Sequence, residues 1–258
     1  MESALAIAAM LLSVLSVAIA GWFSARTVRL SHELDNEREQ RQEQRSALQA
    51  ASRVYEPLAQ AAAELQSRIY NVVSTGWVGI VERYQSHGDY AETSTAFLFA
   101  HYFGWVEARR QAVLTSSGAG DRDAVVIRAI DHVRQILRKT DHEEGFLFYQ
   151  VEQRAIGELM FSWDAVDGTG ARLPHVDGYA AFSRRYREDP EFRRWFHPID
   201  SGLALVAAGQ HHRLIEIHGA LLDLIAVLDP TRKYTARYDL KPIEEPSVPA
   251  TPAAPTSS

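Results

Sequence analysis

The sequence contains no cysteine, and this absence excludes disulfide bonds, thiol catalysis and thiolate ligation of a metal. Glycine-rich phosphate loops, dinucleotide-binding loops and the Gly-x-Ser-x-Gly motif of serine hydrolases are missing as well. A net charge of −6 argues against a general nucleic-acid surface, so no nucleic-acid partner is expected. The sequence therefore predicts no catalytic residue, no cofactor and no metal ligand, and an enzymatic role stays undecided.

Apolar residues dominate the start of the chain instead. The segment 3–23 carries no charged side chain and has the length that a helix needs to cross a bilayer core, about 20 residues. Trp22 near its end is followed by Arg26 and Arg29, a pattern typical of a helix end at the membrane interface. We predict a transmembrane helix over 3–23 that contacts the lipid bilayer. A cleaved secretory signal and a buried core helix are the alternatives.

The basic residues that flank this segment predict its orientation. The arginines nearest to it all follow it in the chain, and positive charge collects on the cytoplasmic side of a span. We therefore expect a single-pass membrane protein with an outside N-terminus and a cytoplasmic C-terminal domain. Small residues also recur on one side of the span, which suits either a self-association face or plain lipid contact: Ala6, Ala9, Ser13, Ser16 and Ala20.

The rest of the chain has helical periodicity with few signs of strands, so the predicted class is all-α. We expect a polar juxtamembrane helix over 24–56, an all-helical domain over 57–240 and a proline-rich tail over 241–258. Prolines recur every third residue in that tail, which suits either a polyproline II docking ligand or a disordered segment. The expected helices of the domain are Leu58–Tyr84, Thr93–Leu114, Arg122–Lys139, Phe146–Trp163, Gly178–Arg187, Glu191–Ala208 and His211–Leu228.

Two of the expected helices, over 93–114 and 146–163, are apolar nearly all round and should lie centrally in a helical bundle. Polar residues interrupt them, and a charge inside a core needs a partner. Glu152 in particular falls within an apolar stripe. We predict a buried polar network that fixes the register of the helices, with a catalytic role as the alternative. Its candidate members are His101, Glu107, Glu152, Arg154 and Glu158.

Three histidines lie in the segment 211–218, and one interpretation of this cluster is a metal site. On a helix, however, His212, Glu216 and Asp223 share one face, and that face lies opposite a row of leucines and isoleucines. His211 and His218 lie a full heptad apart, too far to chelate one ion unaided. We interpret the face as the solvated side of an amphipathic helix.

Three segments resemble parts of uncharacterised bacterial proteins with a single N-terminal span: Tyr102–Glu107, Glu152–Glu158 and Leu221–Pro230. The resemblance implies a location in the bacterial inner (cytoplasmic) membrane and transfers no activity. The anchor and helical body favour a scaffold or regulatory module at the cytoplasmic membrane face, acting through a protein partner or self-association. The alternatives are a helical sensor that binds a small ligand among the aromatic residues, and a membrane-tethered enzyme that uses Glu152 or His101.

Overall fold

The structure is a computed structural model that describes the body of the chain. The chain divides into two compact units, Met1–Ala50 and Ala51–Ser258, and every described residue belongs to the second. None of the helices in this described part combines the length and the apolar character needed to cross a membrane. The described residues are 53–84, 89–115, 121–141, 145–166 and 172–243.

Some sequence expectations lie outside these residues. They are the span over 3–23, its edge at Trp22, Arg26 and Arg29, and most of the polar helix that should follow. The prolines that recur every third residue of the tail, Pro246 to Pro255, lie outside them too. The first described helix covers residues 53–74 and passes through Pro57, where the helical domain was expected to begin.

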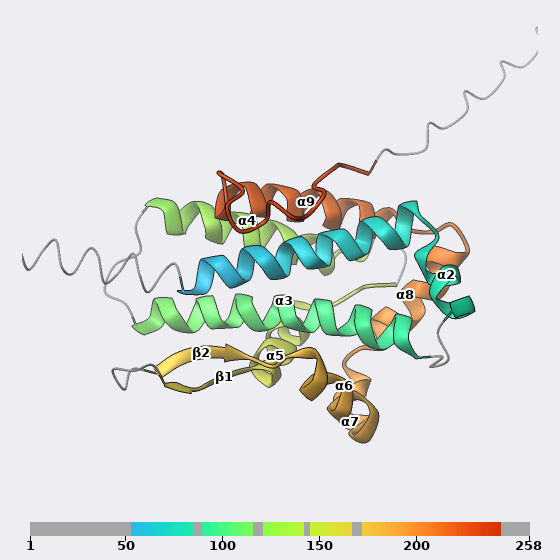
Figure 1. Cartoon of the computed structure of the whole chain (residues 1–258), viewed down its shortest axis with the longest axis horizontal. Coiled ribbons are helices and arrows are strands. Elements are labelled where there is room, and N and C mark those ends of the chain that lie inside the picture. The colour runs from blue at the N-terminus through green and yellow to red at the C-terminus, as the bar shows by residue number, and fades with distance from the viewer. Residues whose placement is uncertain (1–52, 85–88, 116–120, 142–144, 167–171, 244–258) are drawn as a thin grey trace, which may run out of the picture. The chain divides into compact units, whose positions relative to one another are not determined.

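The described part is mostly helical, which confirms the helical class. The longest helices lie along one common axis in Figure 1: residues 53–74, α3 (Tyr90–Thr115), α4 (Asp121–Leu137) and α9 (His212–Leu228). Helix α4 packs against α9, and α3 packs against most of the shorter elements. The shorter helices are α2 (Trp77–Tyr84), α5 (Gln150–Met160), α6 (Tyr179–Glu188), α7 (Pro190–Arg194) and α8 (His197–Ala207).

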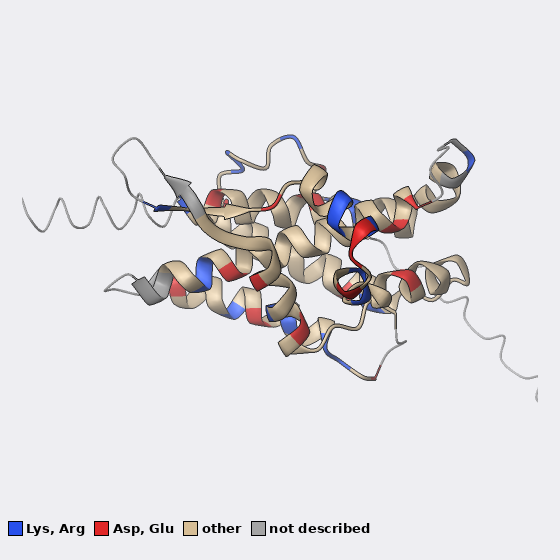
Figure 2. Cartoon of the chain, turned by 90° about the horizontal axis from the view of Figure 1, so that it is seen from below, with Lys and Arg blue, Asp and Glu red and all other residues tan. Residues whose placement is uncertain are grey.

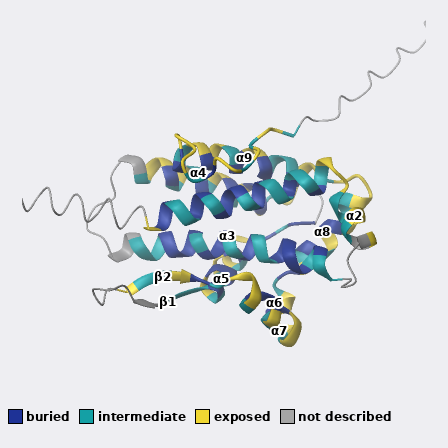
Figure 3. Ribbon diagram, viewed as in Figure 1, coloured by how far each residue is buried: buried dark blue, intermediate teal, exposed yellow. Residues whose placement is uncertain are grey.

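The core forms around α3 because this helix is apolar on most of its circumference. Figure 3 shows buried positions along most of its length. Phe99 stacks on Phe146 and Phe148 with ring centres 5.7 and 5.8 Å apart, and Phe103 meets Phe148 edge-on at 5.6 Å. Such aromatic pairs contribute about 0.5–1.5 kcal/mol beyond the area they bury. Most charged residues lie outside this core, and Figure 2 shows both signs interspersed along the helices.

A β-hairpin packs against α3, contrary to the expectation that strands play no part. Strands β1 (Phe161–Val166) and β2 (Arg172–Val176) are antiparallel, with Phe161 opposite Val176. A Cβ on Gly104 of α3 would lie 2.6 Å from Val176 Cγ1, so glycine permits this close approach. The expected helix to Trp163 is wrong because Phe161, Trp163 and Ala165 alternate with polar residues, the period of a strand.

Two other expected helices are each divided in the structure. The helix expected over 58–84 ends at residue 74, and α2 begins after Gly76, whose φ of +63° favours glycine. The helix expected over 191–208 separates into α7 and α8, and Pro198 lies in the first turn of α8. Proline is favoured there because its missing N–H is unpaired at a helix start in any case.

Candidate functional site

A network of charged side chains joins α3 to α5. The Glu107 carboxylate accepts hydrogen bonds from Arg110 Nε at 2.7 Å and from Gln111 Nε2 at 2.7 Å. Arg110 Nη2 also lies 3.9 Å from Glu158, which accepts a 2.8 Å hydrogen bond from Arg154 Nε. The hydrogen bond with Glu107 raises the pKa of Arg110, so this cation is firmly charged. Glu107, Arg154 and Glu158 are thus linked through Arg110.

This network runs from the core to the surface. The Glu107 side chain is 2% exposed, whereas those of Arg154 and Glu158 are 55% and 49% exposed. A buried carboxylate needs its cation, since removing one partner of a buried pair costs about 3–5 kcal/mol. The exposed pair on α5 is worth only about 0.3–0.5 kcal/mol. The inner pair of Glu107 and Arg110 lies within α3, and the contact that crosses to α5 is the partly exposed one between Arg110 and Glu158.

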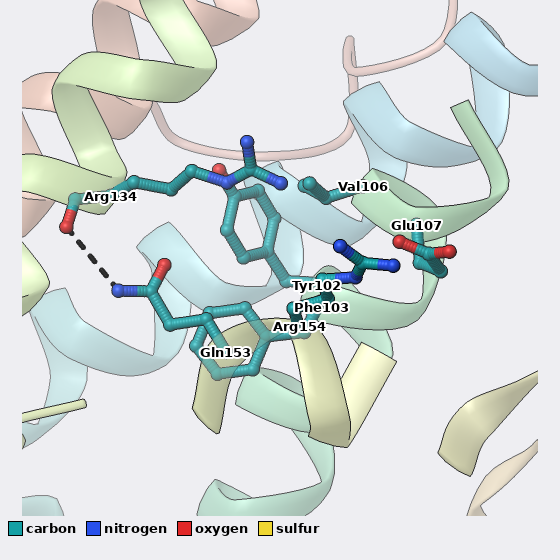
Figure 4. Close-up of a pocket in the computed structure, with 7 residues that line it drawn as sticks. All are labelled: Tyr102, Phe103, Val106, Glu107, Arg134, Gln153 and Arg154. Atoms are coloured by element: carbon teal, nitrogen blue, oxygen red, sulfur yellow. Dashed lines mark hydrogen bonds between the residues drawn. The ribbon is translucent and has the colours of Figure 1, made fainter. Parts of the chain in front are cut away.

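A small polar cavity adjoins the network (Figure 4). It is lined by Tyr102, Phe103, Val106, Glu107, Arg134, Gln153 and Arg154. The cavity leaves about 10 Å³ for the centre of a water molecule, which is room for roughly one water. Tyr102 Oη and Gln153 Oε1 are buried there without a hydrogen-bond partner among the described residues. Burial raises the pKa of Tyr102, so its hydroxyl stays a donor. The cavity suits one bridging water rather than an organic ligand.

Glu152 does not join the network. The sequence placed it in a buried apolar stripe, but in the structure it lies partly exposed in the first turn of α5. Its Oε2 accepts a 2.8 Å hydrogen bond from the backbone N–H of Tyr149. A glutamate at this position satisfies a donor that the helix start would leave unpaired. Glu152 therefore caps α5 and helps to set where that helix begins.

His101 also lies apart from the network, on the side of α3 that faces the 53–74 helix. Trp105 Nε1 donates to His101 Nε2 at 3.1 Å, and Nδ1 lies 4.0 Å from Glu64 Oε2. Burial lowers the pKa of His101, although the Glu64 carboxylate opposes this shift. The ring stacks on Phe97 with centres 5.1 Å apart. The arrangement is that of a neutral, packed histidine that accepts from Trp105.

Two buried polar residues of α9 were missed by the sequence analysis. His212 and Asp223 are exposed, as the amphipathic projection predicts, but Arg213 and His218 are each only 1% exposed. Arg213 donates to the carbonyls of Gly145 at 3.0 Å and Ile136 at 2.9 Å. The burial of Arg213 could have been predicted from its spacing, because it lies one helical turn before the buried Ile217 and so shares its face of α9. Arg213 thereby joins α9 to the chain on both sides of the segment 142–144.

His218 pairs with a glutamine far away in the sequence. Gln66 Nε2 lies 2.8 Å from His218 Nε2, in the core between the 53–74 helix and α9. Burial lowers the pKa of His218 to about 4. The imidazole is therefore neutral near pH 7 and accepts this hydrogen bond through Nε2.

The residues 229–243 after α9 form a C-terminal strap that is fastened to the body. Asp229 is 3% exposed and accepts hydrogen bonds of 2.9 Å from the backbone N–H groups of Lys233, Tyr234 and Thr235. Burial alone would raise the pKa of Asp229, but these hydrogen bonds lower it. The strap then reaches the first helix, where Tyr238 Oη donates to Glu64 at 2.9 Å. Its course is thus set at both ends.

One face of α5 is exposed, contrary to the expectation that this helix is apolar and central all round. The face, here called the α5 surface, begins with Tyr149 and Val151, which are 53% and 78% exposed. Val151 also lines a shallow depression together with Gln150, Arg154, Ala155 and Glu158. The α5 surface thus combines an exposed apolar group with the outer residues of the charged network.

Among the described residues, no group of three or more histidine, aspartate and glutamate side chains is placed to hold a metal ion. Comparison with known protein families, curated proteins and solved structures finds no match to this chain.

Proposed function

We propose that this chain is a single-pass membrane protein whose cytoplasmic helical body is a scaffold or regulatory module that binds another protein. The anchor is supported by the uncharged segment 3–23 and by Arg26 and Arg29 after it. The observation that carries the binding role is the α5 surface, where Val151 is 78% exposed on a helix fixed firmly to the core.

The α5 surface is preorganised, which lowers the entropic cost of binding. Gly157 lets α5 approach α3 so closely that a Cβ there would lie 2.7 Å from the Phe103 carbonyl oxygen. Glu107 of α3 lies at the same contact, and its Cβ would be 3.0 Å from a Cβ added to Gly157. Full burial of a valine contributes about 1.5–3 kcal/mol, and Arg154 and Glu158 supply one charge of each sign for orientation. The partner should therefore offer an apolar centre with complementary charges at its rim.

Site-specific photo-crosslinking in the native membrane tests this proposal. A photoreactive amino acid replaces Val151 in the full chain, and Ala204, an exposed residue of α8, is replaced in the same way as the matched control. We expect a discrete adduct from position 151 that is missing from position 204. The V151D substitution should weaken capture of that same protein by the full chain.

Mass spectrometry of the adduct decides between the possible partners. An adduct with a different protein supports the proposal, and an adduct with a second copy of this chain would replace it with self-association. Identical labelling patterns at positions 151 and 204 would contradict a role for the α5 surface.

A further inference from the structure

Arg68 is a partly buried cation surrounded by neutral groups. It lies on the 53–74 helix, and its Nη1 donates to Ser94 Oγ at 2.8 Å and Thr95 Oγ1 at 3.1 Å. The guanidinium carbon lies 3.8 Å from the centre of the Trp77 ring. No carboxylate among the described residues pairs with this guanidinium. Its positive charge is therefore stabilised by hydroxyls and an aromatic face but is not neutralised.

Several other arginines of the body have a carboxylate partner, which Arg68 does not have among the described residues. Arg109 lies 3.6 Å from Asp123, and Arg110 and Arg154 bond Glu107 and Glu158. Burial lowers the pKa of Arg68, and the neighbouring Tyr90 hydroxyl only partly offsets this. Removing a charge from water costs several kcal/mol unless an opposite charge compensates for it. Binding of an anion would therefore stabilise Arg68.

Two other nitrogens of Arg68 are the candidates for binding that anion. Nη1 donates to the hydroxyls of Ser94 and Thr95, and neither Nε nor Nη2 bonds a carboxylate or carbonyl of the described residues. In Arg110 the corresponding edge, Nε with Nη2, donates two hydrogen bonds to the Glu107 carboxylate, with Nε 2.7 Å from one oxygen. This edge of a guanidinium binds two oxygens of one oxyanion at once. Beside it, the Tyr90 hydroxyl oxygen accepts a hydrogen bond from the guanidinium and supports its positive charge.

We propose that Arg68, with the hydroxyls of Tyr90 and Thr95 and the ring of Trp77, binds the phosphate group of a small molecule or a lipid headgroup. A phosphate suits these donors better than a carboxylate does, because its oxygens point in several directions and it carries more charge. Trp77 and Tyr90, with ring centres 6.4 Å apart, supply the apolar border of the site. The proposal does not depend on the anchor or on the α5 surface.

Thermal unfolding of the full chain in phosphatidylcholine nanodiscs tests the site. Inorganic phosphate should raise the midpoint temperature saturably when ionic strength is held constant with chloride, because a ligand stabilises the folded state that binds it. Acetate should do so at least about tenfold more weakly, since it brings less charge to the site. Nanodiscs that contain phosphatidic acid then distinguish the sources: stabilisation by this lipid without soluble phosphate identifies a headgroup site.

Variants assign the effect to Arg68. The R68Q substitution should weaken phosphate binding by about tenfold to a hundredfold, the usual loss for charge-assisted hydrogen bonds. The control R83Q removes an equally charged but exposed arginine on α2 and should leave binding unchanged. If R68Q fails to fold, Y90F gives the second test, with binding weakened while Arg68 is retained.

Three results would overturn the proposal. They are the lack of any phosphate-dependent rise in the wild-type midpoint, a rise of the same size in R68Q, and stabilisation by acetate as strong as by phosphate.

Discussion

His218 shows how burial fixes the charge state of a single residue in this body. Its pKa is lowered to about 4, against about 6.5 in an unfolded chain. Between these values the unfolded chain binds a proton that the folded chain does not, so stability falls as the pH is lowered through this window. The contribution is fully present above pH 6.5, and its loss amounts to about 3 kcal/mol.

Denaturant titrations of the full chain between pH 7 and pH 4 measure this dependence. In H218Q, where no proton can bind at this position, we expect the free energy of unfolding to fall less steeply than in the wild type. The H212Q variant is the matched control because His212 is exposed on the same helix. Equal pH dependence in the wild type and H218Q would contradict a neutral, buried His218.

Pairing of the residues in the α3–α5 network was partly predictable from spacing alone. Arg154 and Glu158 lie four positions apart on one helix, and Glu107 lies on another apolar helix where a charge needs a partner. The partners of Arg213 and His218 were not predictable, because they lie on segments distant in the sequence. Glu152 was predicted to be buried because a helical projection does not show where the helix begins. In the structure it lies in the first turn of α5.

At the scale of elements, Gly157 determines how closely α5 can pack on α3. An added Cβ would lie 2.7 Å from Phe103 O and 3.0 Å from Glu107 Cβ, and the backbone oxygen cannot move aside cheaply. We expect G157A to lower the free energy of unfolding by about 1–3 kcal/mol, the usual cost of overpacking.

The matched control is Gly219 on α9, where an added Cβ meets nothing within 4 Å. G219A should raise the free energy of unfolding by up to about 1 kcal/mol, because alanine favours the helix more than glycine does. Denaturant titration of both variants measures the difference. Equal effects of the two substitutions would show that the contact between α3 and α5 is not tight.

The sequence predicts most helices because their apolar period is strong, and it fails where two periods compete. Phe161 continues the apolar run of α5, so the helical pattern hides the alternation that begins at the same residue. The breaks before α2 and α8 were missed for another reason. Each depends on one backbone conformation, at Gly76 or near Pro198, that composition alone does not reveal.

At the scale of the whole molecule, the proposed span over 3–23 predicts an orientation that a reporter can measure directly. A reporter fused to the C-terminus, active only in the cytoplasm, should be active, because Arg26 and Arg29 follow the predicted span. Replacing both arginines by glutamine should reduce that activity. A reporter found outside the membrane would contradict the orientation and favour a cleaved secretory signal.

The helical class and the central place of α3 were predictable because both depend on hydrophobic periodicity. The surfaces of the molecule were not predictable from the sequence. Whether Val151 is exposed, or whether Arg68 pairs with a carboxylate of the described residues, depends on which helices meet in space.

The C-terminal strap has a consequence for how the protein is made. Its contacts at Tyr238 and Asp239 fasten it to Glu64 and Gln66, more than 170 positions earlier in the chain. A ribosome adds about 5–20 residues per second, so the strap is synthesised on the order of 10 s or more after the helix that it covers. The polar residues of the 53–74 helix therefore lack these two contacts until the strap has left the ribosome.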